Sequence, residues 1–176
     1  DAKLKLFGPV KNKSYYQSLL ALRESLRLER TLSFEGVFPL QEALTKGNIF
    51  VLSSLSESVP YNLLGAMASQ KAIVATRVGG LSEVLGRAGR LVTPQEPASL
   101  ATALIELLSY PEVCQRLGKR ARQRVLERYN LETMLDSYAN VYTEASYKVH
   151  PSKSAIFLTT ERPSEDPLII LKDRAA

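Results

Sequence analysis

Residues 48–83 read NIFVLSSLSESVPYNLLGAMASQKAIVATRVGGLSE, and this stretch decides the fold. Its apolar run Ile49–Leu52 is typical of a strand buried on both faces of a parallel sheet, and Ala72–Thr76 predicts a second such strand. Between them, Pro60 precedes a segment rich in alanine, leucine and methionine, which predicts a helix over Tyr61–Ser69. The stretch therefore predicts a strand–helix–strand unit.

Similar elements flank this unit on both sides. Upstream, Leu4–Phe7 and Thr31–Phe34 predict strands, and a capping box at Ser14 predicts a helix that runs to about Leu28. The other predicted elements are a strand over Arg90–Val92 and helices over Leu40–Lys46 and Leu81–Leu85, from Pro97, from Pro111 and after Asn130. Because strands alternate with helices, we expect an α/β fold with a doubly wound, Rossmann-like parallel sheet.

The chain of 176 residues is long enough for one domain with a core. We expect that domain over residues 1–147, truncated at its N-terminal edge, because the sequence starts on a strand-like segment without a Met. Residues 148–176 hold scattered charge and three prolines, which predicts a poorly ordered tail. Two short apolar patches in it, Ala155–Leu158 and Leu168–Leu171, are each able to form a strand or a docking segment.

The formal charge of +5 leaves several classes of anionic partner open. Many of the cations lie between Arg116 and Arg128, in a segment whose apolar residues recur every fourth position: Val113, Leu117, Ala121 and Val125. That pattern favours a surface helix with a solvated basic face. Neither aromatic stacking residues nor a reader motif accompanies the charge, so we do not expect nucleic-acid binding.

Cys114 is the only cysteine and His150 the only histidine. A single cysteine excludes an internal disulfide and favours a reducing, cytoplasmic location. Together the two residues make neither a zinc site nor a Cys/His catalytic pair, so no metal is expected. No apolar run approaches the roughly 20 residues needed to span a bilayer.

The candidate site lies where the strand over residues 49–52 ends. Glu57 follows in a serine-rich loop, and ligands of open α/β sheets bind outside the carboxyl ends of the strands. The helix after Pro60 offers unpaired main-chain amides that favour an anion, those of Tyr61, Asn62 and Leu63. We therefore predict a pocket for a phosphorylated ligand. The alternative for Glu57 is a solvated loop acid near a helix N-terminus.

Four motifs, in this order along the chain, resemble those of a known family. The first is NIFVLSSLSES followed by NLLGAMA, the second KAIVATRVGGLSEV, the third GRLVTP, and the fourth PASLATALIELL with the PE that follows it. They resemble the C-terminal, donor-binding half of family 4 glycosyltransferases, which are two-domain enzymes of the GT-B architecture. The similarity extends from about Leu4 to Tyr142. GPV at Gly8–Val10 and FEG at Phe34–Gly36 resemble the subgroup that builds the Pel exopolysaccharide from UDP-glucose.

The resemblance implies roles for single residues. The family holds a Glu-x7-Glu pair here, and Glu57 matches the first acid, which contacts the donor sugar or its phosphate. The second acid, which binds the ribose hydroxyls, is replaced by Gly65, a departure that would weaken donor binding. Val37 matches the base-contacting loop, and the turn Gly79–Gly80 borders the donor pocket.

The implied activity is retaining transfer of a hexose, from UDP-glucose, to a saccharide or polysaccharide, without a metal or other cofactor. The acceptor-binding domain lies upstream in the family, so this chain alone is expected to be inactive. A membrane surface or a polysaccharide-synthesis complex is a further implied partner. Gly65 also supports an alternative, a degenerate non-catalytic domain with an interaction or regulatory role. The chain lacks the acid and base residues that a non-hydrolysing epimerase would need. Glycoside hydrolysis is not expected either, because Glu57 has no second carboxylate beside it.

Overall fold

The structure is a computed structural model in which residues 2–149 are described. The chain divides into two compact units, Asp1–Asn130 and Leu131–Ala176. Each unit is considered by itself. The domain boundary expected after residue 147 stays a prediction, and from residue 150 onward the expected tail, with its two apolar patches, lies outside the described residues.

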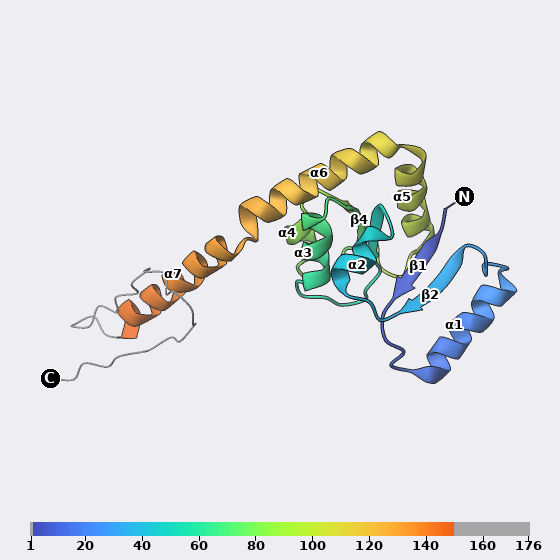
Figure 1. The fold of residues 1–176 in the computed structure, drawn as a ribbon. Helices are drawn as coiled ribbons and strands as arrows, with labels where there is room; N and C mark the ends of the chain where they lie inside the picture. Colours follow the sequence, from blue (N-terminus) through green and yellow to red (C-terminus); the bar gives the residue numbers. More distant parts are fainter. Residues whose placement is uncertain (1, 150–176) are drawn as a thin grey trace. The chain divides into compact units, whose positions relative to one another are not determined.

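Strands and helices alternate through the first unit, as the sequence predicts (Figure 1). The strands are β1 (Leu4–Phe7), β2 (Leu32–Gly36), β3 (Ile49–Leu52), β4 (Ala72–Thr76) and β5 (Arg90–Val92). The helices are α1 (Lys13–Ser25), α2 (Leu40–Thr45), α3 (Tyr61–Ala68), α4 (Leu81–Leu85), α5 (Pro97–Ser109) and α6 (Pro111–Arg128). The second unit contains α7 (Leu131–Val149). The predicted elements are all present, with ends that differ by a few residues.

The start of α1 corrects the capping box predicted at Ser14. The N-cap is Asn12, whose side-chain oxygen accepts the N–H of Tyr15 at 3.0 Å. The Ser14 hydroxyl instead donates to that same oxygen at 2.8 Å. An asparagine oxygen satisfies an N–H of the first turn as well as a serine does, so the helix begins at Lys13.

The described strands form two parallel sheets, with the orders β1-β2 and β3-β4-β5. This confirms the α/β class and the parallel pairing. A single continuous sheet was expected, however, and β1 and β3 are not hydrogen-bonded neighbours in the part of the chain that is described. In Figure 1 the pair β1–β2 with α1 lies to one side of β4 and its surrounding helices.

The core is centred on β4, whose five residues are all buried. Ile73 and Ala75 pack with residues of α3, α4 and α6, whereas Ala72 and Val74 pack with residues of α5 and α6. Successive side chains of a strand point to opposite faces, so helices cover both faces of this sheet. This is the expected doubly wound arrangement. Because β3 and β4 pair in parallel, their carboxyl ends lie side by side.

No helix among residues 2–149 is long and apolar enough to cross a membrane.

Candidate functional site

Glu57 is held in place at the carboxyl end of β3. Its Oε1 accepts a hydrogen bond from the Ser54 hydroxyl at 2.8 Å, and the residue is half-buried. The Thr76 hydroxyl donates to the main-chain oxygen of Ser54 at 2.6 Å. Because Thr76 is the buried last residue of β4, the loop that carries the acid is tied to the centre of the sheet. Sequence reasoning missed Ser54 and Thr76 as positioning residues, although the serine-rich loop and the hydroxyl at a strand end were visible signals.

The glycine turn after β4 packs directly against this loop. A Cβ at Gly79 would lie 1.7 Å from the main-chain oxygen of Glu57, and one at Gly80 would lie 2.8 Å from that of Ser58. Gly79 also has a φ of +48°, which favours glycine. The structure therefore brings the predicted residues Glu57, Gly79 and Gly80 together, and neither glycine tolerates a side chain without movement.

The start of α3 differs in one respect from the sequence prediction. Pro60 is the N-cap, and Tyr61 is 86% exposed just after it. The N–H of Leu63 donates to the carbonyl oxygen of Pro60 at 3.0 Å, because the first turn closes on itself. This corrects the expectation of an unpaired amide at Leu63, whose side chain is also fully buried. The amides of Tyr61 and Asn62 remain as anion-binding candidates.

Gly65 faces helix α2. A Cβ at this position would lie 2.7 Å from Cδ2 of Leu40 and 3.9 Å from Cδ1 of Leu44. The glycine therefore permits close packing of α2 on α3, a structural reason for a residue that costs helix stability. Its assignment to ligand binding stays a prediction.

A groove of about 690 Å³ runs between β1 and β3. At the carboxyl ends of the strands it is lined by Gly8, Pro9, Val37, Ser53, Ser54 and Asn62. Among the predicted site residues, Val37 and Asn62 thus line this groove, and Val37 is 73% exposed. Glu57 does not line it, but its hydrogen-bond partner Ser54 does, so the acid lies beside a cavity.

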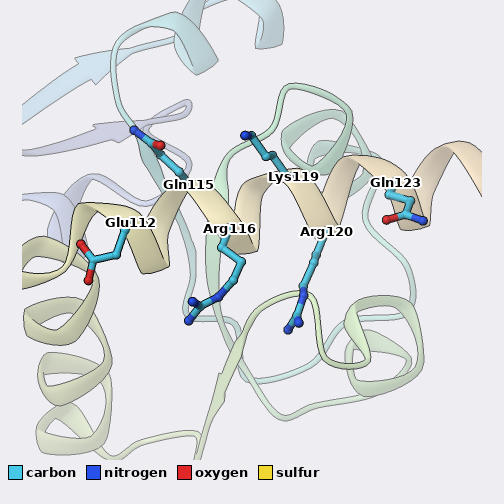
Figure 2. A pocket seen from close by; sticks show the side chains of 6 residues that line it. All are labelled: Glu112, Gln115, Arg116, Lys119, Arg120 and Gln123. Carbon is cyan, nitrogen blue, oxygen red and sulfur yellow. The ribbon is translucent and has the colours of Figure 1, made fainter.

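A second, shallow hollow of about 330 Å³ lies on α6 (Figure 2). It is lined by Glu112, Gln115, Arg116, Lys119, Arg120 and Gln123, which all project from that one helix. Arg116, Lys119 and Arg120 are exposed, which agrees with the predicted solvated basic face. Arg124 departs from that prediction, since its Nε donates to the main-chain oxygen of Val84 at 2.7 Å.

Residues 2–149 contain no group of three or more His, Cys, Asp or Glu side chains that could hold a metal ion. Cys114 is half-buried on α6, and burial raises the pKa of its thiol. A raised thiol pKa disfavours the thiolate, the form that reacts as a nucleophile. His150 lies outside the described residues.

The sequence of the chain was compared with those of known protein families and proteins. The pattern of the family described as glycosyl transferases group 1 matches residues 1–110. The chain is 32% identical over 145 residues to the N-acetyl-α-D-glucosaminyl L-malate synthase of Bacillus anthracis, covering 81% of this chain and 37% of that protein. It is 34% identical over 113 residues to the MMP α-(1→4)-mannosyltransferase of Mycolicibacterium hassiacum, covering 62% of this chain and 28% of that protein.

Solved structures agree with the fold. The sucrose-phosphate synthase of Thermosynechococcus elongatus superposes with a TM-score of 0.73 at 25% identity, covering 83% of this chain and 39% of that one. HepE of Anabaena in complex with UDP-glucose superposes with a TM-score of 0.74 at 20% identity, covering 81% of this chain and 41% of that one. These neighbours are GT-B glycosyltransferases, and the chain spans about two fifths of their length. Because the family pattern covers well over half of the sequence, the chain belongs to the group 1 glycosyl transferases.

Proposed function

We propose that this chain is the donor-binding part of a retaining glycosyltransferase that transfers a hexose from UDP-glucose to a saccharide or polysaccharide acceptor. The observation that carries the proposal is the fixed carboxylate of Glu57 at the carboxyl end of β3, beside the start of α3. Membership of the group 1 family and the fold shared with a complex of UDP-glucose support it.

In the proposed mechanism Glu57 orients the donor sugar. The Ser54 hydroxyl fixes one oxygen of this carboxylate, so the other is able to accept a hydrogen bond from a sugar hydroxyl. The amides of Tyr61 and Asn62, at the positive end of the α3 dipole, hold phosphate or sugar oxygens. Charge developing on the leaving diphosphate is stabilised by these fixed donors, without a metal, and the diphosphate assists deprotonation of the acceptor on the same face.

The acceptor and the partners complete the proposal. GPV at Gly8–Val10 and FEG at Phe34–Gly36 favour the Pel exopolysaccharide subgroup, with the protein in the cytoplasm and associated with a membrane surface or a synthesis complex. The acceptor-binding domain is supplied by polypeptide beyond this chain. We therefore expect residues 1–176 to produce no transfer or hydrolysis of UDP-glucose, and turnover by the purified chain would contradict this part.

Calorimetric titration of the chain with UDP and UDP-glucose tests the donor site. We expect saturable binding, which Glu57→Gln weakens by about ten- to a hundredfold for UDP-glucose, the effect of losing a charged hydrogen bond of roughly 1.5–3 kcal/mol. The substitution should weaken the binding of UDP alone less, because Glu57 is proposed to contact the sugar side of the donor. Glu83 is a neighbouring acid on α4, so Glu83→Gln is the matched control. This variant should bind UDP-glucose as the parent does.

A second candidate, a degenerate domain with an interaction or regulatory role, is favoured by the glycine at position 65. A side chain there meets Leu40, so no carboxylate reaches a ribose from this position unless Leu40 moves. Absence of binding at millimolar UDP-glucose by both the parent and the double variant Gly65→Glu/Leu40→Ala would favour this candidate over the first.

A further inference from the structure

The cations of α6 differ in what they contact. Arg116, Lys119 and Arg120 line the shallow hollow on the helix and are exposed (Figure 2). Arg122 and Arg124 instead donate to main-chain oxygens of α3 and α4, which lie beside α6 (Figure 1). These two contacts depart from the solvated basic face that the sequence predicts.

The C-terminal end of α4 is completed by Arg124. The last four carbonyls of a helix have no partner within it. In α4 the oxygens of Ser82 and Leu85 accept from main-chain N–H groups that follow the helix. The oxygens of Glu83 and Val84 accept from Nη2 and Nε of Arg124 at 2.6 and 2.7 Å. One guanidinium of α6 thus supplies both of the remaining donors.

The guanidinium of Arg124 is closely fitted to the end of α4. A Cβ at Gly86, the residue that ends the helix, would lie 3.1 Å from Cζ of Arg124. Arg124 is half-buried. Arg122, which donates to the oxygen of Ala68 at the end of α3, is exposed and makes a single such bond. The contact of Arg124 is therefore the more confined of the two.

Val84 connects this contact to the candidate site. Its carbonyl accepts from Arg124, while its N–H donates to the oxygen of Gly80 at 3.0 Å. The five residues of α4 span only about 7.5 Å, so a movement at the end of the helix is transmitted to the glycine turn before it. That turn packs against the candidate acid, since a Cβ at Gly79 would lie 1.7 Å from the main-chain oxygen of Glu57.

We propose that Arg124 is a positioning residue for Glu57, which acts through α4 and the glycine turn. This inference rests on the proposed function, in which Glu57 orients the donor sugar. Burial of Leu81 and Leu85 fastens α4 to the core, but apolar burial is non-directional. Two hydrogen bonds from one planar guanidinium fix the orientation of the helix as well. Arg124 itself contacts neither the sugar nor the diphosphate.

The variant that tests this role is Arg124→Lys. A lysine keeps the positive charge but presents one compact ammonium in place of the planar fork. It cannot reproduce the paired contact with two neighbouring carbonyls. The matched control is Arg120→Lys, on the exposed side of the same helix. Urea unfolding of both variants establishes that each folds cooperatively before the site is measured.

The first measurement uses no nucleotide. In a chain with isotope-labelled glutamate, the Cδ resonance of Glu57 is assigned by its absence from Glu57→Gln. We expect this resonance to shift in Arg124→Lys and to stay in place in Arg120→Lys. The Cδ resonance of Glu106, which is bound by Arg90 instead, is the internal control and should move in neither variant. A Glu57 resonance that Arg124→Lys leaves unchanged would overturn the proposal.

The second measurement is calorimetric titration with UDP-glucose and UDP. We expect Arg124→Lys to raise the dissociation constant of UDP-glucose by about three- to tenfold, less than the loss of the Glu57 carboxylate itself. The dissociation constant of UDP should rise less, since Glu57 is proposed to contact the sugar side. Arg120→Lys should bind both ligands as the parent does. A shifted Glu57 resonance with unchanged affinity for UDP-glucose would count against the positioning role.

The double variant Glu57→Gln/Arg124→Lys separates positioning from general loosening of the fold. Independent residues give losses of affinity that multiply, whereas residues that act as one unit do not. Because Arg124 is proposed to act through Glu57, the double variant should bind UDP-glucose no more weakly than Glu57→Gln does. Losses that multiply would refute this route from α6 to the site.

Failure of the proposed function is a separate outcome. A parent chain that does not bind millimolar UDP-glucose would remove the donor site, but the Glu57 resonance would still show whether Arg124 sets the position of that side chain. A parent chain that binds UDP-glucose, with Arg124→Lys changing neither resonance nor affinity, would remove the positioning role alone.

Discussion

The main chain at Gly79 lies against the main-chain oxygen of Glu57, which would be only 1.7 Å from a Cβ at residue 79. The turn after β4 therefore sets the position of the loop after β3. The loop with the candidate catalytic acid is therefore positioned by β4, whose five residues are all buried.

Gly79→Ala tests this contact. The methyl group clashes with Glu57, and an alanine with φ near +48° is strained by about 1–3 kcal/mol. We expect a loss of stability of at least that size in urea unfolding, together with weaker UDP-glucose binding. Gly47→Ala is the control, since beyond its two chain neighbours the nearest atom to its Cβ would be 3.9 Å away. Equal effects of the two substitutions would show that the contact is not tight.

Thr76→Val tests the tie between β4 and the loop. It removes the hydroxyl that donates to Ser54 while keeping the shape of the side chain. We expect a loss of about 0.5–1.5 kcal/mol of unfolding free energy. Thr76→Ser, which retains the hydroxyl, should preserve the hydrogen bond and bind UDP-glucose like the parent. If valine and serine weaken donor binding alike, the hydrogen bond does not position Glu57.

Gly118→Ala tests the packing of α6. Alanine is the better helix former by about 1 kcal/mol, so an exposed position would gain stability. Here, however, the methyl group would lie 2.1 Å from the main-chain oxygen of Gln70. We expect a net loss of about 1–3 kcal/mol in thermal or urea unfolding, as for an overpacked core. Gln115→Ala, at an exposed site of the same helix, should leave stability the same or slightly higher.

Glu106→Gln tests a pH-dependent link between α5 and β5. The Arg90 side chain donates to both oxygens of Glu106, at 2.9 and 2.5 Å, and these bonds lower the pKa of the carboxyl. A lowered pKa stabilises the fold above the unfolded-state value, and this stabilisation is lost as pH falls through the folded-state value. Both side chains are more than a third exposed, so the contribution is at most about 1 kcal/mol.

In urea unfolding the parent chain should therefore exceed Glu106→Gln in stability at pH 7, and the difference should shrink as the pH falls below the ordinary glutamate pKa of about 4.3. Glu112→Gln, at an exposed position on α6, controls for the general effect of removing a carboxylate. A difference between parent and Glu106→Gln that persists unchanged at pH 3 would mean that packing, not charge, links the two elements.

The sequence predicts the elements well, because strand and helix patterns are local. The run Ala72–Thr76 is fully buried as expected, and the acid, the glycine turn and the strand ends meet in space. Choices between neighbouring donors and acceptors are harder to predict. Asn12 caps α1 in place of Ser14, and the Leu63 amide is paired with Pro60, because both outcomes depend on the conformation of one turn.

Long-range relationships were not predictable from the pattern. Nothing in the sequence indicates that Gly65 packs against Leu40, which comes from a different helix. The division into two sheets was also missed, because whether β1 and β3 pair depends on residues far apart in the chain. Hydrophobic periodicity identifies a strand but not what lies beside it.

The separation of the two sheets has a consequence for handling the protein. Helix α1 has no buried residue, so the lobe β1–α1–β2 has little to hold it to the rest and should open as its own low-stability foldon. Open, apolar strand edges are also templates for aggregation between molecules. A polypeptide that covers these edges would thus raise the solubility and protease resistance of the chain, apart from any effect on catalysis.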